Sequence, residues 1–214
     1  MKHDAQTWAN YAEAFAFLGN SLLAPMNQTG TVGLLPEFWQ QFPTFDDVKV
    51  ALALQACEAY AVDAQRAVER GEDAVRKASV DYTKLFVGPP HPAAPPWETM
   101  HRGDGASVGF GEATFDMKRL LREAGLEVSN QNNQYADHIG IELLYASVFC
   151  GRVAGALDAG DTACADDLAG QLGRFIGDHP GAWIGRLVTA ATEAAAGSYV
   201  VRLLELSSAL LATV

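Results

Sequence analysis

The chain has 214 residues, 49% hydrophobic and 19% charged, a globular composition that excludes a disordered chain, a collagen and a coiled-coil rod. Fifteen Lys and Arg residues against 26 Asp and Glu residues give a formal net charge of −11 at pH 7. Because a nucleic-acid-binding face has to neutralise phosphates, this balance argues against a nucleic-acid partner and favours a cationic one.

The N-terminal segment and the cysteines favour a cytoplasmic protein. Polar residues between Asp4 and Glu13 interrupt any apolar stretch that could serve as a signal peptide. No uninterrupted apolar run reaches the 18 or so residues of a membrane span, so we expect no stable membrane insertion. The three cysteines lie in Ala-, Leu- and Val-rich surroundings, where we expect small buried side chains: Cys57, Cys150 and Cys164.

The first helix is predicted from apolar residues at helical spacing, and Pro25 with the polar residues after it ends the segment. A short aromatic helix is expected over 34–42. The predicted apolar stripe of the first helix consists of Trp8, Tyr11, Ala12, Phe15, Leu18 and Leu22.

A long Ala-rich helix follows. Thr44 with Asp47 resembles a capping box that opens this helix, and the pattern continues to about Arg70. A further helix is expected over about 72–86. The apolar stripe that we predict for the long helix consists of Val48, Leu52, Ala56 and Ala59.

Five of the nine prolines lie between residues 89 and 96. Proline lacks the amide donor and blocks helix formation, so we predict an extended loop over 87–108. A loop of this length inside a helical domain usually has a function. A polar run predicts a second linker over 127–135.

The remaining segments predict more helices. Helices are predicted to begin near Gly111 and near Asp137. Asp161 is expected to cap the next helix, and Pro180 to open another. A last helix is expected after Gly197. No Val/Ile/Thr alternation indicates a strand. We therefore predict an all-α protein with no sheet, a single globular domain spanning 1–214 with about nine or ten helices.

Asp137, His138 and Glu142 are the first candidate for chemistry. His138 and Glu142, at i and i+4, form half of a metal or acid–base site. A metal needs further ligands, and none has a usable spacing, so we expect no metal. The alternative for Asp137 is a helix N-cap. Since no nucleophile elbow, phosphate loop or reactive cysteine is found, we expect an interaction protein with no catalytic residue rather than an enzyme.

A second candidate site combines apolar and acidic residues. Tyr82, Leu85 and Phe86 line one side of a helix end, and the proline-rich loop then presents Trp97 and Glu98. One interpretation is an apolar groove with acidic edges that holds a peptide. The other is that Leu85 and Phe86 are core residues, onto which Trp97 fixes the loop.

Two segments here resemble the motifs of the TorD/DmsD chaperone family. The first is DYTKLFVGP at 81–89, followed by APPWE at 94–98, and the second is ADHIGIEL at 136–143. Their order and separation, the chain length and the all-helical pattern also fit a TorD-like fold. A looser aromatic motif of the family is similar to a set further on: Phe175, His179 and Trp183.

The resemblance implies a cytoplasmic maturation chaperone for a molybdopterin-dependent oxidoreductase of the DMSO reductase family. Such a chaperone binds the twin-arginine leader and the apo catalytic subunit until the cofactor is inserted. Some members of the family bind guanine nucleotides weakly, and some form domain-swapped dimers. The resemblance therefore implies a monomer or dimer. We expect no required cofactor, and weak guanine-nucleotide binding follows only from the resemblance. The predicted leader-binding residues are Tyr82, Leu85, Phe86, Pro96, Trp97, Glu98, Asp137, His138 and Glu142.

Within this set, Asp137 with Glu98 is expected to accept the paired arginines, and His138 to tune binding near neutral pH. The alternative function is a small helical metal- or nucleotide-dependent hydrolase centred on Asp137, His138 and Glu142.

Overall fold

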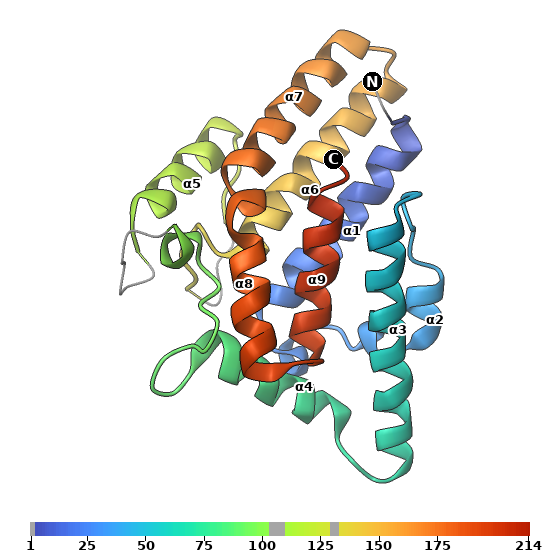
Figure 1. Cartoon of the computed structure of the whole chain (residues 1–214). Coiled ribbons are helices and arrows are strands. Elements are labelled where there is room, and N and C mark those ends of the chain that lie inside the picture. Colours follow the sequence, from blue (N-terminus) through green and yellow to red (C-terminus); the bar gives the residue numbers. More distant parts are fainter. Residues whose placement is uncertain (1–2, 103–109, 129–132) are drawn as a thin grey trace. The chain divides into compact units, whose positions relative to one another are not determined.

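A computed structural model describes residues 3–102, 110–128 and 133–214 (Figure 1). These described residues form nine α-helices and no strand, apart from one isolated antiparallel bridge between Trp97 and His138. The predicted all-α class is confirmed. The chain divides into two compact units, each assembled from separate stretches of sequence. A single domain spanning 1–214 stays a prediction.

Unit 1 contains residues 1–23 and 97–183, together with Val214. Figure 1 shows α6 beside both α1 and α7, and these are its main helix contacts. The helix α8 (Pro180–Ala195) begins in unit 1 and continues into unit 2. The other helices of unit 1 are α1 (Ala5–Leu23), the 3₁₀-helix η4 (Glu98–His101), α5 (Glu112–Glu123), α6 (Ile139–Asp158) and α7 (Thr162–Asp178).

The contact between α1 and α6 is unusually close at two glycines. A Cβ atom on Gly19 would lie 2.8 Å from the carbonyl oxygen of Gly140. A Cβ atom on Gly140 would lie 2.7 Å from the carbonyl oxygen of Gly19 and from Leu23 Cγ. Hydrogen at both positions therefore lets the two backbones approach. The apolar residues predicted to line one side of α1 are buried, with one exception. Ala12 is only partly buried, and Ala14 is buried instead.

The helix α6 is long and apolar enough to span a membrane by length and composition, although Glu142 and Arg152 interrupt its apolar run. Of its 18-residue apolar window, 61% is buried inside the protein. Its apolar character is therefore accounted for by its place between α1 and α7 in the core of unit 1.

Unit 2 contains residues 24–96 and 184–213. The helix α3 packs against α2 and α9, and the second part of α8 completes the unit. Its other elements are the 3₁₀-helices η1 (Met26–Gln28) and η2 (Val32–Leu34), α2 (Pro36–Gln40), α3 (Val48–Glu69), α4 (Ala74–Tyr82), the π-helix η3 (Thr83–Val87) and α9 (Tyr199–Leu211).

The stripe predicted for α3 is wrong. Val48 and Leu52 are 74% and 59% exposed, whereas Val50 and Leu54 on another side are buried. Because apolar residues occur on every side of this Ala-rich helix, their spacing does not identify the buried side. The cap was also misplaced by three residues: Asp47, not Thr44, accepts the backbone N–H groups that open α3.

The remaining helix boundaries agree better with the sequence. Asp161 caps α7, Pro180 opens α8 and Ser198 caps α9. Cys57 and Cys150 are buried as predicted, but Cys164 is exposed, in the first turn of α7 where its N–H donates to Asp161. The expected linker over 127–135 is non-helical at its described ends, and its residues 129–132 lie outside the described part.

The expected proline-rich loop over 87–108 is shorter than predicted, because η3 includes Val87 and η4 lies inside the loop. Gly88 ends η3 with a φ of 95°, a conformation that favours glycine, and a Cβ there would lie 2.7 Å from the His91 backbone. Residues 103–109 of the predicted loop lie outside the described part.

Candidate functional site

The nine predicted leader-binding residues fall in both units. Those from unit 2 are buried, and the rings of Tyr82 and Phe86 lie 5.2 Å apart. The Ala94 N–H donates to the Leu85 carbonyl at 2.8 Å, which holds the proline-rich loop against η3. Leu85 and Phe86 are therefore core residues, as in the second interpretation, and do not form an open groove. Their role in leader binding stays a prediction.

In unit 1, Asp137 fastens three segments together. Its Oδ2 accepts hydrogen bonds from the Thr99 backbone N–H at 3.0 Å and the Thr99 hydroxyl at 2.6 Å. Its Oδ1 accepts from the Thr114 hydroxyl at 2.9 Å. The side chain is fully buried. Asp137 is therefore not the N-cap of α6, and its carboxylate is not an exposed acceptor for arginine.

His138 is the actual N-cap of α6. Its Nδ1 accepts a hydrogen bond from the Gly140 N–H at 3.0 Å. Burial lowers the pKa of this imidazole to about 3, because a charged ring loses its hydration there. The expectation that His138 tunes binding near neutral pH is therefore wrong, since the ring remains neutral in that range.

This shift predicts a pH effect on folding. Between pH 6.5 and about 3 the unfolded chain binds a proton on His138 that the folded chain does not. The contribution of His138 to the free energy of unfolding should therefore fall as the pH falls through this window. We expect the ring resonances of His138 in NMR spectra to stay constant from pH 8 to 5, and to titrate near 6.5 in urea-unfolded protein. A folded-state titration near neutral pH would contradict this burial argument.

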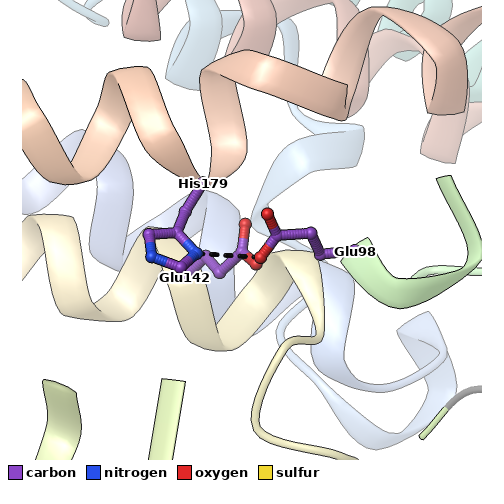
Figure 2. A group of neighbouring side chains, drawn as sticks. All are labelled: Glu98, Glu142 and His179. Atoms are coloured by element: carbon purple, nitrogen blue, oxygen red, sulfur yellow. Dashed lines mark hydrogen bonds and ion pairs between the residues drawn. The ribbon is translucent and has the colours of Figure 1, made fainter. Parts of the chain in front are cut away.

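Glu142 lies in a second buried cluster of unit 1, with Glu98 and His179 (Figure 2). His179 Nδ1 lies 2.9 Å from Glu98 Oε2, and the Arg102 Nε–H donates to Glu98 Oε1 at 2.8 Å. The Trp183 indole N–H donates to Glu142 Oε2 at 3.0 Å. Burial, with the Glu98 carboxylate nearby, raises the pKa of Glu142 well above its ordinary value.

The cluster corrects two expectations from the sequence. Glu142 was paired with His138 by helical spacing, but its neighbours come from η4 and the end of α7. The sequence offers no further ligand at a usable spacing, but the fold brings Glu98 and His179 beside Glu142, and the expectation of no metal stays a prediction. Glu98 and Glu142 are fully buried, so they form no exposed acidic edge. The family's looser aromatic motif already contained His179 and Trp183, and it was the signal that could have located the cluster.

Unit 1 also has an open apolar groove of about 680 Å³ that the sequence did not reveal. Phe110 and Tyr135, with ring centroids 5.5 Å apart, are 40% and 41% exposed. The ring centroid of the half-buried Trp97 lies 5.9 Å from that of Tyr135, so Trp97 packs against one of the two exposed aromatic rings. The groove is also lined by Leu121, Leu126, Val128 and Ile141, with Lys118, Arg122 and Glu127 among its polar residues.

Comparisons with known proteins place both motifs inside one family match. The sequence model of a family described as "Nitrate reductase delta subunit" matches residues 47–189. Curated relatives named Tat proofreading chaperone DmsD, from Salmonella typhi and Salmonella typhimurium, are 36% identical over 66 residues. That alignment covers 31% of this chain and 32% of each relative, so the chain matches about a third of their length.

Proposed function

Because the chain belongs to the nitrate reductase delta subunit family, a family of TorD-like chaperones, we propose that it binds the twin-arginine leader of a molybdopterin-dependent oxidoreductase. In this proposal it holds the apo catalytic subunit in the cytoplasm while the cofactor is inserted, and so delays export. The observation that carries the proposal is the family match over 47–189, which includes both motif segments. The matched relatives are named as Tat proofreading chaperones.

The groove of unit 1 supports binding of the apolar body of a leader. Aromatic residues such as Phe110 and Tyr135 supply large contact areas at low entropic cost, which is typical of peptide-binding surfaces. Lys118 and Arg122 line the same groove, so the cationic head of a leader is expected to lie elsewhere. The net charge of −11 favours approach of that head to the protein as a whole.

We expect Tyr135→Ala to weaken binding of a synthetic twin-arginine leader peptide by about thirtyfold. Truncation of an aromatic anchor costs about 2 kcal/mol, and 1.4 kcal/mol corresponds to a factor of ten. Isothermal titration calorimetry with the leader of a molybdopterin oxidoreductase measures the change. Leu52→Ala, which removes an exposed apolar side chain from unit 2, is the control and should bind like the wild type.

A twin-lysine version of the same peptide tests the chemistry of the head. Arginine forms bidentate bonds to carboxylates and lysine does not, so the twin-lysine peptide should bind more weakly. Equal binding of the two peptides contradicts twin-arginine recognition. Unchanged binding by Tyr135→Ala contradicts the assignment of the groove alone.

The geometry does not support a hydrolase in which Asp137 or His138 acts as the base. Asp137 is engaged by Thr99 and Thr114, and His138 Nδ1 by the backbone of α6. Neither group is therefore available as a general base in this arrangement. Weak guanine-nucleotide binding and the choice between monomer and dimer stay predictions from the family resemblance.

A further inference from the structure

We propose that Glu98, Glu142 and His179 bind a divalent transition-metal ion, for which Zn²⁺ is the probe. This site is independent of leader binding. Each residue offers one ligand atom, and the three atoms lie within 4.8 Å of one another. Figure 2 shows the side chains approaching one another from η4, α6 and the end of α7. Because zinc–ligand distances are about 2.0–2.2 Å, small adjustments bring all three atoms around one ion.

The hydrogen bonds of the cluster leave one carboxylate oxygen of Glu142 for an ion, whereas Glu98 Oε2 and His179 Nδ1, 2.9 Å apart, have to exchange their mutual contact for the ion. Arg102 occupies Oε1 of Glu98, and Trp183 occupies Oε2 of Glu142. The other oxygen of Glu142, Oε1, is buried and receives no hydrogen bond from the described residues. Metal-binding carboxylates are commonly held by such outer donors, which orient the remaining oxygen toward the ion.

The charges also call for a cation. Two carboxylates are fully buried in the cluster, and Arg102 is ion-paired with one of them, Glu98. Buried carboxylates are normally paired with cations or coordinate metals, since their desolvation is costly. Arg102 already offsets the charge of Glu98, so the buried charge that a bound cation would balance is that of Glu142. The mixed imidazole and carboxylate set favours Zn²⁺ over Mg²⁺, which prefers oxygen ligands alone.

An ion can reach this cluster from an open groove. His179 lines a groove of about 360 Å³ in unit 1, together with Phe175, Arg174 and Asp178. His179 itself is only 7% exposed, and its Nδ1 contacts Glu98, so this residue both lines the groove and belongs to the cluster. Three protein ligands leave a fourth position for water, the arrangement found in catalytic zinc sites.

The test is a calorimetric titration of the chelator-treated 214-residue chain with Zn²⁺ alone. We expect saturation at one ion per chain, without competition from equimolar Mg²⁺. Glu142→Gln and His179→Asn should each lower the affinity by about 100-fold or more, since loss of an outer partner alone costs 10–100-fold. Circular dichroism establishes that each variant is folded. His138→Asn keeps a capping oxygen for α6 and lies outside the ligand set, so it should bind like the wild type.

A measurement on the wild type avoids any folding defect of the variants. In NMR spectra, Zn²⁺ should shift the ring resonances of His179 and leave those of His138 unchanged. The proposal is overturned by absence of saturable binding, by full binding in a folded Glu142→Gln variant, or by unshifted His179 resonances. A Glu142 carboxyl that stays protonated in infrared spectra at saturating Zn²⁺ also overturns it, because the two carboxylates then share a proton instead.

Discussion

Asp137→Ala should lower the free energy of unfolding by about 3–5 kcal/mol, because its fully buried carboxylate connects three segments of unit 1. The substitution removes three hydrogen bonds to a buried carboxylate and leaves the Thr99 N–H and hydroxyl without acceptors. It also separates η4 and the start of α5 from the start of α6. Urea unfolding followed by circular dichroism measures the loss.

Two variants distinguish this role from helix capping. Asp137→Asn can still accept from Thr99 through its oxygen and donate to the Thr114 hydroxyl, so we expect a loss of about 1–2 kcal/mol. Asp161→Ala removes a true N-cap bond, from the Cys164 N–H at 3.0 Å, and should cost about 1 kcal/mol. If Asp137→Ala costs no more than Asp161→Ala, Asp137 does not fasten these segments.

Gly140→Ala is expected to cost about 3 kcal/mol of stability because the α1–α6 contact has no room for a methyl group. The new Cβ would lie 2.7 Å from the Gly19 carbonyl oxygen, a backbone atom that cannot move without shifting α1. Overpacking of this kind typically costs 1–3 kcal/mol. Thermal and urea unfolding of the variant measure the effect.

Gly155→Ala provides the matched control in the same helix. A Cβ atom at Gly155 meets nothing within 4 Å, so only the helix propensity changes there. Alanine should then stabilise the protein by about 0.5–1 kcal/mol. The opposite signs of the two substitutions test the close contact. A neutral Gly140→Ala would show that α1 and α6 separate easily.

The boundaries of the helices were predictable where the sequence carries local signals. Pro25 and Pro180 act through the proline ring, Asp161 acts through its side-chain carboxylate, and each ended or began a helix as expected. The buried side of α3 was not predictable, because Val48 and Val50 are equally apolar and packing against the other elements of unit 2 decides between them. The π-helix after Tyr82 likewise depends on packing and on the loop that follows.

The site was predictable as a set of residues but not as a set of contacts. Motif resemblance identified Glu98, Asp137 and Glu142, yet helical spacing connects only residues within one helix. The partners of Glu142 come from η4 and from the end of α7, far away in sequence. The burial of these three carboxylates could not be predicted either, because a charged residue is ordinarily expected at the surface.

Because unit 1 is built from two main stretches of sequence, its first helix is synthesised well before the helix that covers it. The Ser147 hydroxyl donates to the Ala12 carbonyl across 135 residues of sequence. At about 5–20 residues per second, a ribosome needs roughly 7–27 s to add that stretch. During this interval Trp8, Phe15 and the rest of the apolar side of α1 are outside or near the exit tunnel without α6 to cover them. The nascent chain therefore carries an uncovered, aggregation-prone segment until α6 emerges, and a chain that ends before Ile139 would keep it uncovered.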